Sequence, residues 1–319
     1  MEYEFMKYGL LIRNSSKTYA YQKIHDEAIL AEDYGFDSVH IDDHFYSFDS
    51  EGKQLYLDAL VVMSAIAVET TKVKLGYSVL CNSYRNPALL AKMITSIDNI
   101  SQGRALLWIG AGWRQEEYKA YGYPFPSAKE RVDQFEEAIK IFKKLFTEEV
   151  TNYEGRFWRL EKCRNFPKPV QKPYPQIIVG SSGNRMQTIA CREADGINMF
   201  FYGEEVLKER VNLINRKLKK FGRNPLKFEI SLQTSVTLVR NEDEKDNIVG
   251  EILKQAKDEK LTKEKILENR FIGTADEIRR RMQTLERIGV KKMVTDIWGS
   301  PSIKDPLKLF HDEMVIKSS

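Results

Sequence analysis

Short apolar segments alternate with longer amphipathic segments along most of the chain, and the pattern is clearest between residues 71 and 113. Val73–Val79 is β-branched and apolar enough for a buried strand. Ala105–Ile109 is nearly all apolar, as expected for a strand covered on both faces of a parallel sheet. Between them, Asn86 and Pro87 provide an N-cap and a first helical residue, and apolar residues then recur at helical spacing. This stretch predicts a strand–helix–strand unit.

The same alternation extends over the whole sequence and predicts eight strands. They are Lys7–Ile12, Ser38–Ile41, Val73–Val79, Ala105–Ile109, Gln176–Val179, Gly196–Met199, Phe228–Val239 and Lys292–Ile297. The amphipathic segments predict helices at Tyr19–Tyr34, Leu57–Val68, Pro87–Ile100, Lys129–Phe146, Glu204–Phe221, Glu242–Lys260, Ala275–Ile288 and Asp305–Val315, and a further helix that follows Gly183 and ends near Ala194. Eight strand–helix repeats joined by short turns predict an α/β fold, a (β/α)8 TIM barrel. A doubly wound open sheet is the alternative.

No segment reads as a linker between domains, so residues 1–319 are predicted to form a single TIM-barrel domain. Residues 151–175 interrupt the repeat and are rich in proline and aromatic side chains. We interpret them as an inserted loop with a short hairpin at Tyr153–Leu160.

Composition and charge narrow the class of protein. With 319 residues and 42% hydrophobic content, the chain can bury a large core. Fifty basic against 46 acidic residues give a net charge of +4 spread along the sequence, so we expect no nucleic-acid partner. The apolar runs are much shorter than the roughly 18 residues of a membrane span, and no signal peptide is visible. The chain has three cysteines, Cys81, Cys163 and Cys191, which are far apart and form no CxxC pair. This pattern favours a reducing cytoplasm and argues against a zinc ribbon.

Polar residues follow the second predicted strand directly, as Asp42, Asp43 and His44. In repeats of strands and helices, the carboxyl ends of the strands are where chemistry is placed. A histidine beside carboxylates can act as an acid or a base, because imidazole titrates near neutrality. The structural alternative is a capping aspartate and a hydrogen-bonded histidine.

A metal site is the alternative at the same strand, because His40 and Asp42 alternate along it and can share a face. The other histidines, His25 and His311, are not at predicted strand ends. The sequence therefore predicts no metal.

Small residues, Gly180 to Gly183, turn the fifth predicted strand into a helix. Backbone N–H groups at a helix start can bind an anion, and the hydroxyls of Ser181 and Ser182 can add donors, so this turn is a candidate phosphate site. A simple tight turn is the alternative. The segment matches neither the nucleotide P-loop nor G-x-S-x-G, and residues 110–112 are too short for a dinucleotide fingerprint.

Five segments together resemble a known family: AEDYGFDSVHIDDHF, KVKLGYSVLCNSYRNPALLAK, DNISQGRALLWIGAGW, KPVQKPYPQIIVGSSGNR and ADGIN. They are similar, in matching order from about Lys7 to Ile297, to the bacterial-luciferase-like superfamily. The closer similarity is to its coenzyme F420-dependent branch, which includes methylenetetrahydromethanopterin reductases and F420-dependent glucose-6-phosphate and alcohol dehydrogenases. The resemblance implies a TIM barrel, usually dimeric, that binds FMN or F420 at the carboxyl ends of its strands.

The resemblance also implies roles for individual residues. The family's aspartate–histidine pair falls on Asp43 and His44, with the histidine as the acid–base residue near the reactive ring. The remaining implied cofactor contacts are Ser78 and Val79, joined by a non-proline cis peptide bond, then Cys81, Ala111, Gly112, Glu116, Gly180, Ser181, Ser182 and Gly183. One departure concerns the strand-4 loop, where the sugar-phosphate dehydrogenases carry a catalytic glutamate and this chain has Trp113. Glu116 or Glu117 could substitute from the next turn.

These observations predict an oxidoreductase that transfers a hydride between F420 and a small organic substrate. An FMN-dependent monooxygenase supplied by a flavin reductase is the first alternative. A metal-dependent TIM-barrel hydrolase and a non-catalytic cofactor-binding protein are the others. We expect a cytoplasmic homodimer without nucleic-acid or membrane partners. The sequence does not identify the substrate, whose pocket would come from loops such as Tyr46–Leu55 and Phe157–Pro173.

Overall fold

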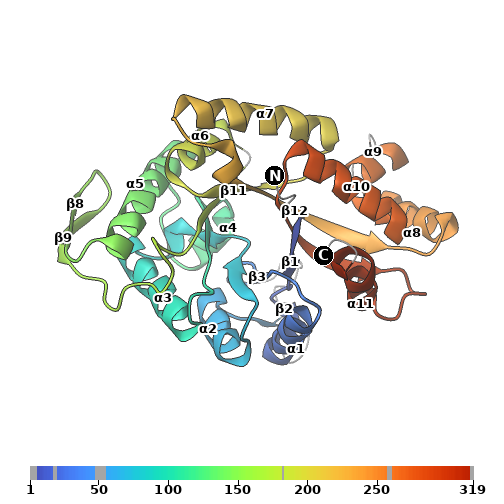
Figure 1. The fold of residues 1–319 in the computed structure, drawn as a ribbon, viewed down its shortest axis with the longest axis horizontal. Helices are drawn as coiled ribbons and strands as arrows, with labels where there is room; N and C mark the ends of the chain where they lie inside the picture. The colour runs from blue at the N-terminus through green and yellow to red at the C-terminus, as the bar shows by residue number, and fades with distance from the viewer. Residues whose placement is uncertain (1–5, 17–19, 47–54, 182, 257–260, 317–319) are drawn as a thin grey trace. The chain divides into compact units, whose positions relative to one another are not determined.

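The computed structural model describes residues 6–316 apart from 17–19, 47–54, 182 and 257–260 (Figure 1). The chain divides into two compact units. The first unit comprises Ile12–Glu32 and Ser38–Ile197, and the second comprises the residues up to Leu11, Asp33–Asp37 and the residues from Asn198 onwards. The chain passes from the first unit to the second within β11 (Gly196–Phe200).

Parallel strands form the centre of the first unit. Its strands are β2 (Ser15–Ser16), β3 (Ser38–Ile41), β4 (Leu55–Tyr56), β5 (Lys74–Tyr77), β6 (Leu80–Cys81), β7 (Leu107–Gly110), β8 (Thr151–Glu154), β9 (Arg159–Cys163) and β10 (Ile177–Gly180). Strand β3 pairs in parallel with β5, and β7 pairs in parallel with both β6 and β10. A parallel bridge between Leu75 and Ala105 joins the two groups. The carboxyl ends of the parallel strands β3, β5, β6, β7 and β10 therefore lie along one edge.

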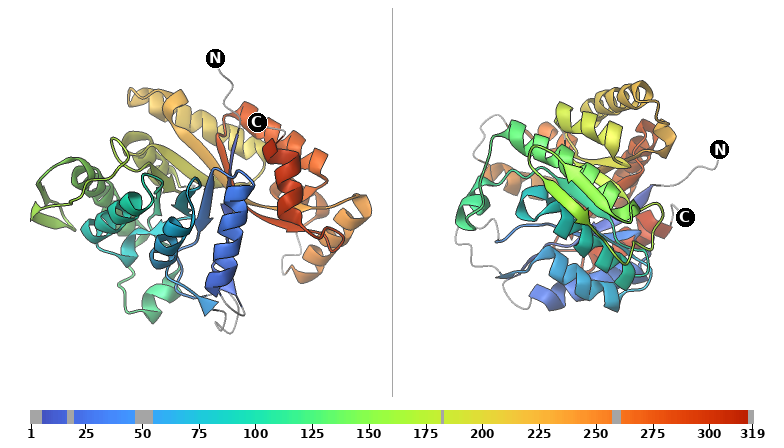
Figure 2. Two further views of the ribbon diagram at one scale, coloured as in Figure 1. Left: turned by 60° about the horizontal axis from the view of Figure 1, so that its bottom comes forward. Right: turned by 90° about the vertical axis from the view of Figure 1, so that its left-hand side faces the viewer.

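Helices cover the strands of the first unit (Figures 1 and 2). They are α1 (Ala20–Asp33), α2 (Ala59–Glu69), α3 (Pro87–Ile100), α4 (Gln115–Ala120), α5 (Ala128–Thr147) and α6 (Asn184–Glu193), with a short 3-10 turn at Asn82–Tyr84. Helix α3 begins as predicted, with Asn86 accepting from the amides of Ala88 and Leu89 and with Pro87 in its first turn. Helix α3 packs against both α2 and α5.

The second unit contains the other strand–helix repeats. Its strands are β1 (Lys7–Leu11), β12 (Glu229–Leu238), β13 (Phe271–Gly273) and β14 (Lys292–Gly299). Strand β14 lies between β1 and β12, β13 pairs with β12, and all these pairs are parallel. The helices are α7 (Glu204–Lys220), α8 (Glu242–Gln255), α9 (Lys263–Asn269), α10 (Ala275–Ile288) and α11 (Pro306–Phe310). A 3-10 turn at Pro225–Lys227 lies between α7 and β12, and a π-helical turn at His311–Val315 follows α11.

The predicted fold class is confirmed. Each of the eight predicted strands is present, helices follow them in order, and parallel pairing makes the sheet of the (β/α)8 class. The predicted hairpin in the insertion is also present, since β8 and β9 pair in antiparallel fashion with Tyr153 opposite Leu160. No helix in the described ranges is long and apolar enough to cross a membrane. The prediction of a single domain stays a prediction.

Several elements differ from the sequence-based expectation. The short strands β2, β4, β6 and β13 and the short helices α4 and α9 were not predicted, because segments of that length carry too little periodicity to stand out. The helix expected at Glu242–Lys260 ends at Gln255, where Ala256 adopts an extended conformation. Residues 257–260 lie outside the described residues.

Candidate functional site

The predicted site residues of the first unit follow the carboxyl ends of its parallel strands. Asp43 and His44 follow β3, Ser78 and Val79 follow β5, Cys81 ends β6, Ala111 and Gly112 follow β7, and Gly180 ends β10. The register places Ile41 beside Tyr77 and Cys81 beside Gly110. The fold thus brings together segments that are far apart in the sequence. Ser182 lies outside the described residues.

The peptide bond between Ser78 and Val79 is cis, as the family resemblance predicted. The amide of Ser78 donates to the carbonyl of Ile41, 2.8 Å away, so this segment stays attached to β3. The side chain of Val79 lies against two strand ends. A Cβ atom built at Gly180 would come within 2.6 Å of Val79 Cγ2, and one built at Gly110 within 3.1 Å. The two glycines therefore make room for Val79.

Replacing Gly180 with alanine is expected to destabilise the protein by about 1–3 kcal/mol, because the new methyl group overpacks Val79. Urea unfolding measures this loss. In the Val79→Ala background the opposing methyl groups are absent. Gly180→Ala should therefore cost less stability in that background than in the wild type. Equal losses in both backgrounds would contradict the packing explanation.

Asp43 is a buried partner of Arg85. Two oxygens of its carboxylate accept from Arg85 Nη1 and Nη2 at 2.8 and 3.0 Å, and Oδ2 also accepts from the amide of Cys81 at 2.8 Å. Arg85 Nη2 donates in addition to Asp58 Oδ2 at 2.8 Å, and Asp58 caps the start of α2. The carboxylates of Asp43 and Asp58 raise the pKa of Arg85 despite the opposing effect of burial. Asp43 therefore ties the end of β3 to β6 and, through Arg85, to α2.

His44 forms a pair with Glu117, a residue of α4. The distance from His44 Nδ1 to Glu117 Oε2 is 2.8 Å, and the Glu117 side chain is fully buried while that of His44 is 15% exposed. Glu117 Oε2 also accepts from the hydroxyl of Tyr84 at 2.8 Å. Glu117 Oε1 accepts from the amide of Phe45 at 2.9 Å and from Arg114 Nη1 at 3.0 Å. Four donors thus surround one carboxylate.

The ionised form of Glu117 is favoured by this arrangement. Burial alone would raise the pKa of Glu117, but hydrogen bonds and charge from His44, together with hydrogen bonds from Tyr84 and Phe45, outweigh burial and lower the pKa. Burial and the neighbouring Glu117 raise the pKa of Tyr84, so its hydroxyl keeps its proton and donates. The pair can hold and move a proton at the imidazole while Glu117 remains a carboxylate.

Sequence reasoning singled out Glu116 as the cofactor contact on this helix. The structure leaves Glu116 exposed and turns Glu117 toward His44. Adjacent helical residues point in directions about 100° apart, so only one of the two can enter the cluster. Tyr118, which follows Glu117, is fully buried and marks the side of α4 that faces the protein interior. This aromatic residue was the sequence signal that could have favoured Glu117 over Glu116.

Cys81 and Gly112 pack around Tyr118. The Cys81 sulfur lies 3.2 Å from the Tyr118 hydroxyl, and burial raises the pKa of the Cys81 thiol to about 12. Gly112 has φ +80°, and a Cβ atom there would lie 1.9 Å from the Tyr118 hydroxyl and 2.7 Å from the Cys81 sulfur. Only glycine fits at this position. The Cys81 thiol is protonated at neutral pH and packs as a small apolar group.

Gly180 to Gly183 connect β10 to α6. The amide of Gly183 donates to Ser181 Oγ at 3.0 Å, and Gly183 is the N-cap of α6 without a side-chain cap. Gly183 has φ −75°, which any residue can adopt, and a Cβ atom there would meet only Ser181 Oγ, at 3.6 Å. Packing within the protein does not require glycine at 183. The start of α6 is therefore open to a close approach, as an anion site needs.

His40, the residue that raised the question of a metal, belongs to the core. Its Nε2 lies 2.9 Å from Ser38 Oγ, its Nδ1 lies 3.3 Å from the carbonyl of Tyr77, and its ring packs against Trp108. Within the residues that the structure describes, no group of three or more His, Cys, Asp or Glu side chains could hold a metal ion.

A family model described as luciferase-like monooxygenase matches residues 6–266. The chain belongs to the luciferase-like monooxygenase family. The resemblance seen in the sequence is thereby confirmed.

Two relatives illustrate the range of this family. An F420-dependent glucose-6-phosphate dehydrogenase of Kineococcus radiotolerans is 36% identical over 186 residues, which cover 57% of this chain and 53% of that protein. An FMNH2-dependent dimethylsulfone monooxygenase of Pseudomonas putida is 28% identical over 199 residues, which cover 62% and 54%. The chain matches about half the length of these curated relatives.

Solved structures of luciferase-like family members share the fold over nearly the whole chain. An F420-dependent secondary alcohol dehydrogenase in complex with an F420–acetone adduct has a TM-score of 0.82 at 21% identity, with 98% of both chains covered. The coenzyme F420-dependent tetrahydromethanopterin reductase of Methanopyrus kandleri has a TM-score of 0.81 at 19% identity, with 99% of this chain and 100% of that chain covered. At such identities the similarity establishes the luciferase-like barrel fold.

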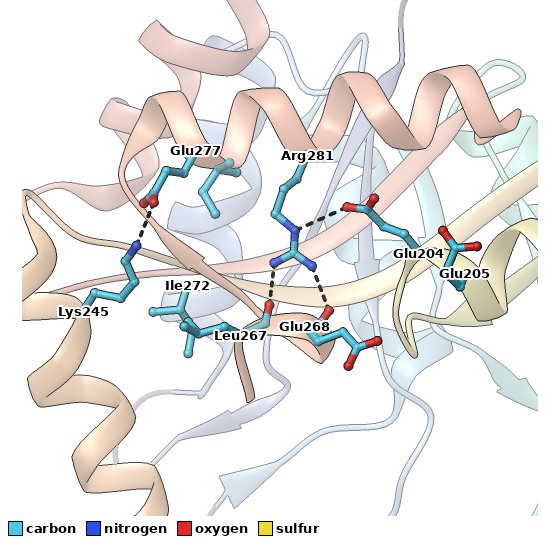
Figure 3. A pocket seen from close by; sticks show the side chains of 9 residues that line it. Glu204, Glu205, Lys245, Leu267, Glu268, Ile272, Glu277 and Arg281 are labelled. Carbon is cyan, nitrogen blue, oxygen red and sulfur yellow. Dashed lines mark hydrogen bonds and ion pairs between the residues drawn. The ribbon is translucent and has the colours of Figure 1, made fainter. Parts of the chain in front are cut away.

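A separate hollow in the second unit does not fit the site expected in this family (Figure 3). The two basic side chains that line it, Lys245 and Arg281, already have partners. Lys245 Nζ lies 2.7 Å from both Glu242 and Glu277, and the guanidinium of Arg281 donates to the carbonyls of Leu267 and Glu268 at 2.9 and 2.8 Å. These contacts hold α8, α9 and α10 together. We interpret the hollow as part of the scaffold.

Proposed function

We propose that this protein is an oxidoreductase that transfers a hydride between coenzyme F420 and a small organic substrate. The observation that carries the proposal is the His44–Glu117 pair, an acid–base group at the strand ends where the family places its cofactor. When bound, F420 would accept or donate the hydride, and the protein would fix the ring and exchange the proton. His44 is the proposed catalytic residue.

The proposed cofactor contacts are the residues along the same edge of the first unit. They are Asp43, Ser78, Val79, Cys81, Ala111, Gly112, Glu116, Gly180, Ser181, Ser182 and Gly183. The half-buried Val79 side chain supports a role for Ser78–Val79 as a surface against which a ring can pack. The open, uncapped start of α6 supports phosphate binding at residues 180–183. Asp43 and Cys81 are buried, which supports an indirect role in cofactor binding. They would position the backbone at the ends of β3 and β6.

If residues 180–183 bind the phosphate of F420, two nearly isosteric changes at Ser181 should affect F420 binding differently. Both Ser181→Asp and Ser181→Asn keep an acceptor for the Gly183 amide. Only aspartate adds a negative charge, which should weaken F420 binding by about tenfold, or ~1.4 kcal/mol, through repulsion of the phosphate. Fluorescence titration with F420 measures both affinities. Equal affinities for the two variants would mean that residues 180–183 are only a turn.

The proposed substrate is a small uncharged alcohol or carbonyl compound. Trp113 is 66% exposed and lies edge-on to His44, with ring centroids 6.0 Å apart. The nearby guanidiniums of Arg85 and Arg114 are already engaged by Asp43, Asp58 and Glu117, so neither offers an unpaired charge for a phosphate monoester. Among the described residues of this cluster, the surface beside His44 is aromatic.

Turnover assays test the proposal against its alternatives. Reduction of F420 by secondary alcohols, without reduction of F420 by glucose 6-phosphate, is the expected result. The FMN-dependent monooxygenase relatives favour the second candidate, in which a reductase supplies reduced FMN and oxygen is consumed. Oxygen-dependent turnover with reduced FMN and none with F420 would overturn the proposed function in favour of that candidate. Activity that chelators abolish would favour the hydrolase.

We also propose that the protein is a cytoplasmic homodimer. The described cysteines are free thiols, which suits a reducing compartment. Helix α2 has no charged residue before Glu69, and two of its valines are strongly exposed, Val61 at 68% and Val68 at 67%. Such an apolar surface favours burial against a second copy. Light scattering of the wild type and of Val61→Glu tests the dimer, and a monomeric wild type would contradict it.

A further inference from the structure

The carboxylate of Glu117 faces four groups, of which two can only donate a hydrogen bond and two can donate or accept. The amide of Phe45 and the guanidinium of Arg114, both on Oε1, can only donate. The hydroxyl of Tyr84 and the Nδ1 atom of His44, both on Oε2, can donate or accept. A carboxylate accepts at both oxygens. All four hydrogen bonds are therefore satisfied together only when His44 Nδ1 carries a hydrogen.

We propose that Glu117 is the positioning residue of the site and fixes neutral His44 in the tautomer that carries its hydrogen on Nδ1. The basic nitrogen of the ring is then Nε2, which is the atom that would exchange a proton with substrate. When Nε2 takes up that proton, the adjacent carboxylate stabilises the imidazolium. The catalytic consequence rests on the function proposed above, whereas the tautomer does not.

The surroundings make Glu117 suited to hold the ring rigidly. Its side chain is fully buried, so water does not compete for the carboxylate. Arg114, which binds Glu117 Oε1, also donates to the carbonyl of Tyr46 at 2.9 Å and lies over the Tyr46 ring at 4.6 Å. The Phe45 amide anchors the chain directly after His44. Both the ring and the backbone beside it are thus fixed by one side chain.

Glu117→Gln tests the proposal, because glutamine keeps the size of the side chain but replaces one oxygen by an NH2 group. Phe45 and Arg114 cannot accept, so the amide oxygen must face them. The NH2 group then faces Tyr84 and His44, and His44 Nδ1 must become an acceptor. We expect the neutral ring to switch to the tautomer with its hydrogen on Nε2. Turnover should fall by about 10²–10⁴-fold, with F420 affinity unchanged.

The measurement is ¹⁵N NMR of histidine-labelled protein at a pH where the rings are neutral. The chain has four histidines, and a His44→Gln sample assigns the His44 signals by difference. The wild type should show a protonated Nδ1, and Glu117→Gln should show a protonated Nε2. Tyr84→Phe is the matched control, since it removes the other donor to Oε2 but keeps the carboxylate. It should retain the wild-type tautomer.

Each outcome decides the proposal. A protonated Nε2 in wild-type protein would overturn it without any variant, and so would an unchanged tautomer in folded Glu117→Gln. A tautomer switch with full turnover would support positioning by Glu117 and would overturn the acid–base role of His44. A switch accompanied by loss of turnover, with the wild-type tautomer retained in Tyr84→Phe, supports both proposals.

Discussion

Replacing His44 with alanine is expected to lower turnover by about 10²–10⁴-fold while leaving the fold intact, since this is the usual contribution of a general acid–base group. The side chain is partly exposed, and its Nδ1 atom forms a hydrogen bond with Glu117. Its removal takes away the proton donor and acceptor at the strand ends. It leaves no cavity in the core, because the side chain is partly exposed. Steady-state kinetics with F420 and the preferred alcohol measure the loss.

His25→Ala is the matched control for that result. His25 lies on α1, where it contacts the carboxylates of Asp26 and Glu69, and it belongs to none of the strand-end loops. We expect its turnover to equal that of the wild type. Circular dichroism should show both variants folded. Full activity of His44→Ala would mean that the His44–Glu117 pair has only a structural role.

Removal of the Asp43 carboxylate is expected to produce the largest loss of stability among single changes near the site. Asp43→Ala leaves Arg85, whose side chain is only 10% exposed, without its bidentate partner. Breaking one side of a buried pair costs about 3–5 kcal/mol, because the remaining charge is uncompensated. It also removes the acceptor of the Cys81 amide. Urea unfolding monitored by tryptophan fluorescence measures the change.

Two further variants separate the buried pair from other effects. Asp58→Ala removes a partner of Arg85 whose side chain is 42% exposed, together with an N-cap, and should cost only about 1–2 kcal/mol. The double variant Asp43→Leu/Arg85→Met removes both charges and should be more stable than Asp43→Ala. A stable Asp43→Ala protein that fails to bind F420 would instead assign Asp43 directly to the cofactor.

The barrel could be predicted from the sequence because its signals are local. The start of α3 needs only Asn86 and Pro87, and apolar strands such as Leu107–Gly110 stand out within a few residues. The cis bond at Ser78–Val79 was predicted from the family resemblance alone. Periodicity places the strand ends, so it also places the loops that follow them.

The contacts inside the site were not predictable in the same way. Glu117 lies 73 residues from His44, and periodicity along the chain does not bring two such distant side chains together. The packing of Gly180 against Val79, a residue about 100 positions earlier, has no local signature in the sequence. The same holds for the hydrogen bonds that Asp43 accepts from Arg85 and from the Cys81 amide. Each of these depends on packing between separate repeats.

The most direct test of the central proposal is a titration of the apo-protein with F420 and, separately, with FMN, followed by absorbance and fluorescence. We expect saturable binding of F420 with one site per chain, weaker binding of FMN, and reduced F420 affinity in Ser181→Asp but not in Ser181→Asn. Tight binding of FMN with no binding of F420 would contradict the proposed cofactor and favour the monooxygenase.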